Sequence, residues 1–363
     1  MNHFDAMGRA FELARMGWGR VSPNPMVGAL ILQGDRVVAE GWHAEFGGPH
    51  AEAVALARAG AAARGATVVV TLEPCNHQGK QPPCAEALIR AGVARVVVAV
   101  PDPNPEARGG AQRLRDAGIA VEFGVREDEA RALNGIFFHR FAGLGRPFLA
   151  LKLATTLDAR IADQTGRSRW ISGEEARDYV HWLRAGFDAI AVGGHTARVD
   201  NASLTVRGDI EPRRPPTRVV FDRHGELPDA LALVQTAEAV PTVLITELVG
   251  PSAHLARLEE AGVTVSRVGG LAEGLAALHQ LGIGSLLVEG GGRLAGALLE
   301  AGLVDRYYWI QAPVWLGDAG VPAITGYPGT TLVEAERWSV VERRALGQDT
   351  LLVVDREPCS LES

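Results

Sequence analysis

Short β-branched runs alternate with Ala- and Leu-rich stretches along most of the chain, and this alternation limits the fold more than any other feature. The expected strands of the first part are 26–32, 36–41, 67–72, 95–100 and 119–124. The stretches expected to be helical, which carry charges on one side, are 51–63, 85–91 and 112–117. Strands and helices in this order predict a sheet covered by helices, an α/β/α sandwich.

The alternation is interrupted at Gly143-Leu144-Gly145-Arg146-Pro147, after an expected helix over 127–140. Two glycines and a proline break regular structure, so the predicted domains are 1–145 and 146–363. A chain of 363 residues is long enough for two domains, each with its own core.

The second part repeats the alternation, which predicts a second α/β domain. Its expected strands are 148–157, 189–192, 217–221, 242–246, 263–268 and 286–289. The run Ser172-Gly173-Glu174-Glu175 has the form of a capping box and predicts a helix that continues to Leu183 or Arg184.

Charge and cysteine content narrow the class of partner. The 36 basic and 43 acidic residues leave a net charge of −7, which argues against a nucleic-acid or anionic membrane surface and favours a small-molecule partner. Three cysteines, Cys75, Cys84 and Cys359, are too few and too unevenly placed for a secreted disulfide framework. With no signal-peptide pattern and no apolar run of the ~20 residues that span a bilayer, a cytoplasmic protein is expected.

One histidine and two cysteines suggest a metal site. His50, Cys75 and Cys84 would give zinc three protein ligands and leave the fourth position open for water, as in catalytic zinc sites. His50 and Cys84 each begin an expected helix, and Cys75 ends an expected strand. Glu52, beside the histidine, is the candidate to carry a proton from the water to a leaving group. Taken singly, the histidine could be a helix cap and the cysteines small core residues.

The pattern His50-Ala51-Glu52 with Pro74-Cys75 resembles the zinc-dependent cytidine-deaminase superfamily. Eight residues separate the two cysteines, whereas most members have two, and the longer loop resembles the deaminase part of the bifunctional riboflavin-biosynthesis deaminase/reductases. The motifs at 22–28, 41–44 and 101–105 agree with this resemblance, while Gln81 replaces a usual threonine. The resemblance implies that pyrimidine and ribose phosphate are bound by Asn24, His43, His77, Lys80, Asp102 and Asn104.

The second part resembles the reductase half of the same family, which has a dihydrofolate-reductase-like fold. The matching segments are 152–158, 168–173, 180–185, 188–194, 200–207 and 288–292. Thr156, Ala159, His195 and Ala202 depart from the usual residues.

A glycine run, Glu289-Gly290-Gly291-Gly292-Arg293, precedes an expected helix at 294–301. Its backbone N–H groups could approach a pyrophosphate, although its spacing is not the Rossmann fingerprint and a tight turn is the competing interpretation. The resemblance implies a nicotinamide cofactor held by Ala154, Trp170, Thr196, Asp200, Gly291, Gly292, Arg293, Leu294, Ala295, Gly296 and Ala297. It implies substrate contacts from Lys152, Ser168, Arg184, Asp200, Leu204, Arg207 and Glu289. For Trp170, a place in the core is the alternative.

The activity implied by the resemblance has two steps. The first domain would use one Zn²⁺ per chain to deaminate 2,5-diamino-6-(5-phosphoribosylamino)pyrimidin-4(3H)-one by hydrolysis. The second would use NADPH to reduce the ribosyl group to ribityl. Two alternatives stay open. One is a nucleoside or nucleic-acid zinc deaminase with an accessory C-terminal domain, and the other is a non-enzymatic protein in which zinc only stabilises the fold. The oligomeric state is open, including a homo-oligomer.

Overall fold

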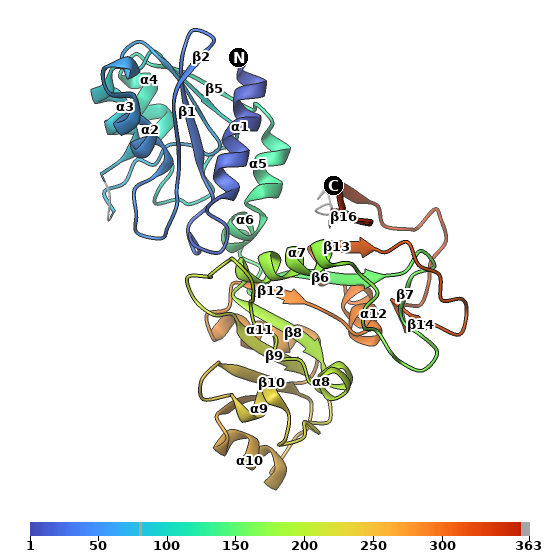
Figure 1. Cartoon of the computed structure of the whole chain (residues 1–363). Coiled ribbons are helices and arrows are strands. Elements are labelled where there is room, and N and C mark those ends of the chain that lie inside the picture. Colours follow the sequence, from blue (N-terminus) through green and yellow to red (C-terminus); the bar gives the residue numbers. More distant parts are fainter. Residues whose placement is uncertain (80–81, 357–363) are drawn as a thin grey trace. The chain divides into compact units, whose positions relative to one another are not determined.

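The computed structural model describes residues 1–79 and 82–356. The chain forms two compact units, 1–143 and 144–363, which are described separately (Figure 1). The divide between them falls inside the glycine- and proline-containing segment 143–147.

The first unit contains a five-stranded sheet in the order β2-β1-β3-β4-β5. The strands are β1 (Gly28–Gln33), β2 (Arg36–Trp42), β3 (Thr67–Val70), β4 (Arg95–Val98) and β5 (Ala120–Phe123). β1 is antiparallel to β2 and β3, whereas β3, β4 and β5 are parallel to one another. The carboxyl ends of three neighbouring strands therefore share one edge of the sheet.

Helices cover both faces of this sheet, which confirms the predicted α/β/α sandwich. One face packs against α1 (His3–Arg15), α5 (Glu127–Leu133) and α6 (Gly135–Phe141). The other packs against α2 (Ala51–Ala59), a following 3-10 turn (Gly60–Ala63), α3 (Cys84–Ala91) and α4 (Gly110–Asp116). Leu30, Val69 and Val97 face the first set of helices, while Ile31 and Val68 face the second, as the two-residue period of a strand requires.

Two sequence predictions for this unit are wrong in detail. The single helix expected over 127–140 is broken at Asn134, because that side chain pairs with a remote backbone: Asn134 Oδ1 accepts from Met26 N–H at 2.8 Å and Nδ2 donates to Met26 O at 3.0 Å. The strand expected to reach residue 72 ends at Val70. Cys75 therefore lies in the loop beyond the strand rather than at its end.

The second unit contains a nine-stranded sheet in the order β11-β10-β9-β8-β12-β6-β13-β16-β15. The strands are β6 (Phe148–Thr155), β8 (Ala189–Gly193), β9 (Thr217–Phe221), β10 (Thr242–Thr246), β11 (Val263–Arg267), β12 (Ser285–Val288), β13 (Arg306–Gln311), β15 (Trp338–Leu346) and β16 (Asp349–Arg356). The strands from β11 to β13 are parallel, and β16 and β15 add an antiparallel edge. A two-stranded sheet joins β7 (Arg160–Ala162) and β14 (Val321–Pro322).

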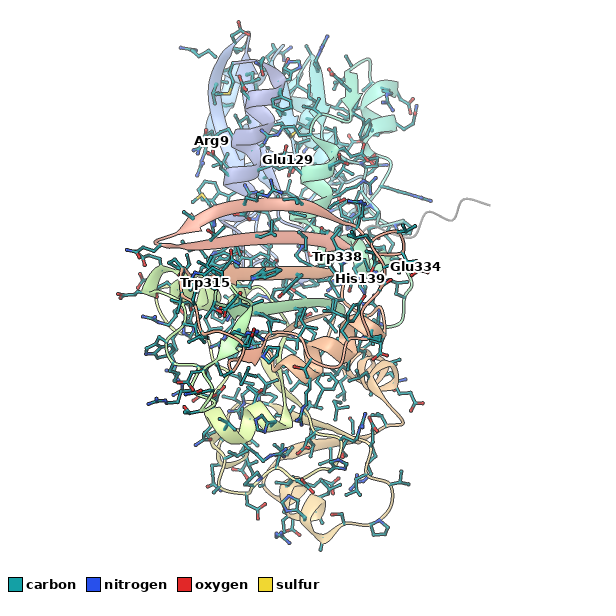
Figure 2. The ribbon with its side chains drawn as sticks, turned by 90° about the vertical axis from the view of Figure 1, so that its right-hand side faces the viewer. Arg9, Glu129, His139, Trp315, Glu334 and Trp338 are labelled. Carbon is teal, nitrogen blue, oxygen red and sulfur yellow. The ribbon has the colours of Figure 1, made fainter. Side chains whose placement is uncertain are left out.

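The larger sheet also has helices on both faces. α11 (Leu271–Gln280) and α12 (Gly292–Glu300) pack on one face, and Trp338, labelled in Figure 2, packs partly buried against the same core. α8 (Gly194–Asp200), α9 (Ala232–Gln235) and α10 (Ala253–Glu260) pack on the other. This arrangement agrees with the predicted α/β reductase-like domain.

The helix predicted from the capping box is present as α7 (Glu174–Ala185), but its predicted cap is not. Gly173 occupies the N-cap position, no side chain caps the helix, and the Gly173 N–H donates to Asp349 Oδ2 at 2.7 Å. A carboxylate 176 residues away in sequence has taken the place of the local cap.

No helix in the described part of the chain is long and apolar enough to cross a membrane.

Candidate active sites

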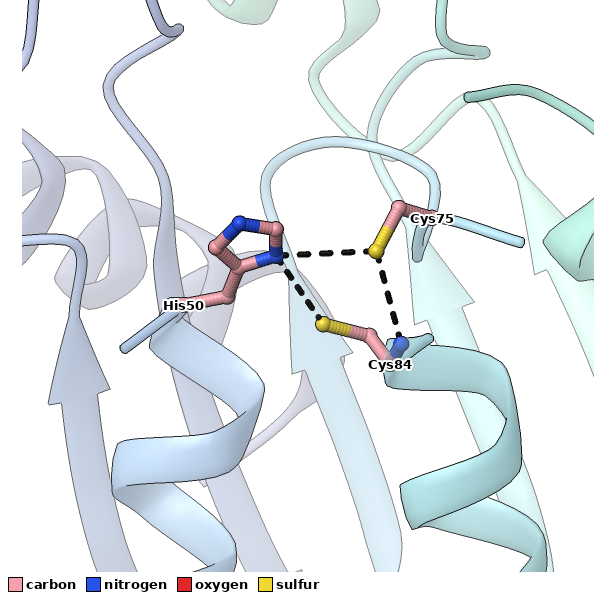
Figure 3. Close-up of side chains that lie close together, drawn as sticks. All are labelled: His50, Cys75 and Cys84. Carbon is pink, nitrogen blue, oxygen red and sulfur yellow. Dashed lines mark hydrogen bonds between the residues drawn. The ribbon is translucent and has the colours of Figure 1, made fainter. Parts of the chain in front are cut away.

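Three ligand atoms meet at the carboxyl edge of the first sheet (Figure 3). His50 Nδ1 lies 3.3 Å from Cys84 Sγ and 3.5 Å from Cys75 Sγ, and all three atoms are within 4.8 Å of one another. A tetrahedral centre with Zn–N near 2.0 Å and Zn–S near 2.3 Å separates its N and S ligands by about 3.5 Å. The donor set and its spacing therefore fit a zinc ion with one position left for a fourth ligand.

The local structure explains why these side chains converge. His50 is the N-cap of α2, Cys84 is the first residue of α3, and Cys75 lies in the loop after β3. The Cys84 backbone N–H donates to Cys75 Sγ at 3.4 Å, so the start of α3 already favours a negative sulfur beside it. Hydrogen bonds from Cys84 and then His50 lower the pKa of the Cys75 thiol to about 4. A thiolate is the form of cysteine that binds metal.

Glu52 is the second residue of α2 and lies beside the donor set. It is only 4% exposed, and burial raises the pKa of its carboxyl group. It lines the same cavity as His50 and Cys75. A buried carboxyl with a raised pKa is suited to accept and return a proton, as the sequence prediction required.

The cavity next to the donor set has a volume of about 290 Å³. It brings together five of the six residues predicted to bind the substrate of this unit: Asn24, His43, His77, Asp102 and Asn104. The sixth, Lys80, lies outside the described residues. The cavity is also lined by Phe46, Leu72, Glu73 and Phe137. Polar groups from four separate loops thus surround one space of small-molecule size.

Two of these residues form a hydrogen-bonded chain that ends on the backbone next to His50. His43 Nδ1 lies 3.0 Å from the carbonyl oxygen of Pro49, so Nδ1 carries the proton and donates. Nε2 is then the acceptor and receives Asn24 Nδ2–H at 3.1 Å. His43 is 3% exposed, and burial lowers its pKa, which keeps the ring neutral. Because Pro49 precedes His50, the chain ties the Asn24 loop to the metal site.

His77 and Asp102 are polar groups of the same cavity wall. Among the described residues, the buried His77 Nδ1 has no hydrogen-bond partner, and His77 lines the cavity. Burial raises the pKa of Asp102 to about 6, and its Oδ1 accepts the Asn104 N–H at 2.8 Å. Glu73 had no role in the sequence prediction although it stands two residues before Cys75, because sequence spacing does not reveal which backbone groups a side chain bonds.

In the second unit, a buried charge cluster lies near the carboxyl ends of the central strands. Arg184 of α7 makes two bonds to Glu289, Nε to Oε1 at 2.6 Å and Nη2 to Oε2 at 2.8 Å. The two side chains are 16% and 8% exposed. Although burial alone would raise it, the pKa of Glu289 falls to about 2 because of Arg184 and then Lys152. Burial lowers the pKa of Lys152. The structure thus pairs two predicted substrate residues with each other.

The same cluster holds the segment that carries Leu204 and Arg207. Arg184 Nη1 donates to Thr205 O at 2.9 Å, and the Arg207 N–H donates to His181 Nδ1 at 3.2 Å. Leu204 is 4% exposed and packs in the core beneath α8, whereas the Arg207 side chain is exposed. Of these two predicted substrate residues, Arg207 is therefore the accessible one.

The glycine run forms the loop between β12 and α12, as expected. The Gly193 N–H donates to Gly290 O at 3.1 Å, which brings the loops after two neighbouring parallel strands together. A Cβ on Gly291 would lie 2.9 Å from Thr196 Oγ1, and one on Gly292 would lie 2.8 Å from Pro322 O. Neighbouring protein atoms therefore leave no room for a side chain at either glycine, and of the two only Gly291 is partly exposed.

The remaining predicted cofactor residues divide between surface and interior. Arg293 is exposed, and Ala154, Leu294 and Ala297 are partly buried, as is the predicted substrate residue Ser168. Ala295 is fully buried in the core, and a Cβ on Gly296 would lie 2.1 Å from Thr325 O, so both pack against protein. Trp170 is 71% exposed, with the Arg177 guanidinium 4.7 Å from its ring, and its alternative place in the core is excluded. Asp200 ends α8, and its carbonyl oxygen accepts from Arg169 at 3.0 Å.

Comparisons with known proteins identify both units. Residues 1–100 match the family model described as the cytidine and deoxycytidylate deaminase zinc-binding region, and residues 147–352 match that of the RibD C-terminal domain. The riboflavin biosynthesis protein RibD of Aquifex aeolicus is 42% identical over 87% of this chain and 90% of its own length, and that of Escherichia coli is 39% identical over 95% and 97%. The solved structure of Acinetobacter baumannii RibD superposes with a TM-score of 0.81 at 37% identity, covering 98% of this chain and 99% of its own. A Thermotoga maritima structure titled as a diaminohydroxyphosphoribosylaminopyrimidine deaminase/5-amino-6-(5-phosphoribosylamino)uracil reductase has a TM-score of 0.80 at 35% identity and covers 98% of each chain.

The fold and donor set of the first unit are those of a zinc deaminase of the cytidine-deaminase type. The second unit is a reductase domain. The chain belongs to the RibD family of riboflavin biosynthesis proteins and is a bifunctional deaminase and reductase. The resemblance drawn from the motifs is thereby confirmed.

Proposed function

We propose that the first unit deaminates 2,5-diamino-6-(5-phosphoribosylamino)pyrimidin-4(3H)-one and that the second reduces the ribosyl group of the product to ribityl with NADPH. The observation that supports the first step is that one cavity is lined by Glu52, by the donors His50 and Cys75, and by a set of polar residues. This set, called the polar wall below, consists of Asn24, His43, His77, Asp102 and Asn104. The deaminase and reductase activities named for the Thermotoga maritima protein support both substrates.

The residues of the first unit have separable roles in the proposed deamination. His50, Cys75 and Cys84 would hold one zinc ion per chain, which when bound supplies an activated water at neutral pH. Glu52 takes a proton from the water and returns it to the amino group that leaves as ammonia, so the carboxyl ends the cycle in its starting state.

The polar wall selects the substrate in this proposal. Asn24 and the neutral His43 offer amide and imidazole groups to the pyrimidine edge. His77 offers an unpartnered nitrogen within the described part of the chain. Lys80, predicted from the sequence as the phosphate cation, keeps that role as a proposal. Matched polar groups of this kind discriminate strongly, because a wrong ligand leaves them buried and unpaired.

In the second unit, the proposed NADPH pyrophosphate meets the backbone at Gly291 and Gly292, where a Cβ would collide with its surroundings. Lys152 and Arg207 face the phosphorylated substrate. Glu289 keeps Arg184 and Lys152 charged near the reacting sugar, and hydride transfer otherwise needs mainly positioning by the protein.

We also propose that the protein acts in the cytoplasm on small molecules and does not bind nucleic acid, in keeping with its net charge of −7. A homo-oligomer is compatible with this proposal but is not required by it.

The test is incubation with the diaminopyrimidine, with and without NADPH, followed by mass spectrometry of the products. Without NADPH only the deaminated compound is expected, and with NADPH its ribityl derivative. Glu52→Gln should keep zinc but lose ammonia release by about 10²–10⁴-fold, the usual contribution of a general acid–base group. The variant should still oxidise NADPH when given the deaminated compound. Undiminished ammonia release would contradict the role of Glu52, and failure of the second reaction alone would contradict the division of labour.

A further inference from the structure

Glu73 lies between β3 and the metal ligand Cys75, and its carboxylate accepts three backbone hydrogen bonds. Oε1 accepts the N–H groups of Gly109 and Ala111, each at 3.0 Å, and Oε2 accepts the N–H of Asp102 at 3.2 Å. The residue is 8% exposed and lines the cavity of the first unit. One buried side chain therefore joins three segments of the site.

The two bonds to Oε1 hold the start of α4 against the metal-ligand loop. The N-cap of α4 is Gly109, which has no side chain to accept the N–H groups of the first turn, and Glu73 supplies the missing acceptor. Pro74 O packs so closely there that a Cβ on Gly110 would lie 1.8 Å from it. The loop of Cys75 and the start of α4 are thus fixed to each other.

The single bond to Oε2 holds the cavity wall. Asp102 Oδ1 accepts the Asn104 N–H at 2.8 Å, and Asn104 Oδ1 accepts the Glu106 N–H at 3.0 Å. These successive turns form one short, internally bonded segment that carries two cavity-lining side chains. Its attachment to Glu73 sets the position of that segment relative to Cys75.

We propose that Glu73 is a positioning residue for the deamination, holding Asp102 and its turn at a fixed place beside the metal-ligand loop. The inference rests on the proposed deaminase function of the first unit. Glu73 acts through Asp102 rather than on the reacting atoms, so its loss changes how substrate is held more than how the metal is held.

Glu73→Gln separates the two sets of bonds. The amide oxygen of glutamine can still accept from Gly109 and Ala111, but its –NH₂ group then meets the Asp102 N–H, donor against donor. We expect KM for the diaminopyrimidine to rise by about tenfold, the effect of losing one buried hydrogen bond, with kcat changed less than about threefold. Zinc content and the NADPH-dependent reaction should match those of the unmodified protein.

Glu86→Gln is the matched control. Glu86 stands two residues after Cys84, as Glu73 stands two before Cys75, but its carboxylate pairs with Arg113 at 2.7 Å in an exposed position. It removes the same charge at the same sequence distance from a ligand. Its KM should equal that of the unmodified protein.

A double-mutant cycle with Asp102→Ala tests the route of the effect. If Glu73 acts through the position of the Asp102 side chain, Glu73→Gln raises KM by a smaller factor in the Asp102→Ala background than in the unmodified protein, whereas fully multiplied effects would overturn the proposal. An unchanged KM in Glu73→Gln, or a loss of zinc that accounts for its lower activity, would also overturn it. Absence of ammonia release from the unmodified protein would instead refute the deaminase function and this inference with it.

Discussion

Glu289→Gln should destabilise the reductase unit, because it removes the negative charge that Arg184 and Lys152 share inside the protein. Glutamine resembles a protonated glutamate, so the cost follows from the pKa of the folded state. Arg184 and Lys152 lower the pKa of Glu289 from 4.5 to about 2, and this difference between the unfolded and folded protein sets the free energy that the charge contributes. The expected loss of unfolding free energy at pH 7 is therefore about 3 kcal/mol, at the low end of the ~3–5 kcal/mol for breaking a buried ion pair.

The effect has a defined pH dependence. Since the folded pKa lies below the unfolded value, the stabilisation is fully present above about pH 4.5 and is lost as the pH falls through about 2. The difference between the two proteins should narrow to about 1 kcal/mol at pH 3.

Thermal denaturation monitored by calorimetry measures this effect. A domain of this size shifts by about 2–4 °C per kcal/mol, so the transition of the reductase unit should fall by roughly 6–12 °C at pH 7. Glu259→Gln is the control, because Glu259 pairs with Arg267 at 3.1 Å on the surface, where such pairs contribute little. If both variants melt together, or if the gap is the same at pH 3 as at pH 7, the assignment of a buried, charge-stabilised cluster is refuted.

Two further variants test contacts that hold the sites in place. Asn134→Ala removes both hydrogen bonds to the Met26 backbone. It should lower the unfolding free energy of the first unit by about 1–3 kcal/mol, measured by urea denaturation, and raise KM for deamination, measured from initial rates. Unchanged values of both would show that α5 and α6 do not support the loop that carries Asn24. Gly296→Ala would place a Cβ 2.1 Å from Thr325 O and should cost about 1–3 kcal/mol in the second unit, measured by thermal denaturation. An unchanged melting temperature of that unit would count against the close approach at Gly296.

The sequence predicted most strands of the two sheets up to β12. These strands are short β-branched runs that alternate with Ala- and Leu-rich segments, and this pattern indicates strands alternating with helices. It did not predict α1, whose charged residues obscure the apolar face formed by Ala6, Met7 and Phe11. It also missed β13, β15 and β16. Most side chains of β15 are exposed, so this segment carries little hydrophobic signal, and its strand conformation depends on pairing with β16.

The metal ligands could be predicted because residue type alone identifies zinc-binding side chains. One imidazole and two thiols with a neighbouring carboxylate rarely occur together for another chemical purpose. The polar wall followed from the family motifs. Neither source indicated Glu73 or Asn134, because each acts through bonds to backbone groups, and a backbone N–H looks the same at every position of a sequence.

Residue type and order therefore determined the α/β class and the donor set, and the resemblance of the motifs to a known family supplied the two chemistries. Only the tertiary structure decided that Arg184 pairs with Glu289, that Leu204 and Ala295 are buried, and that Asp349 replaces the local cap of α7. These outcomes depend on which distant groups a side chain meets when the chain closes. Buried charges and backbone N–H groups must find partners, and the folded chain, rather than the local sequence, supplies them.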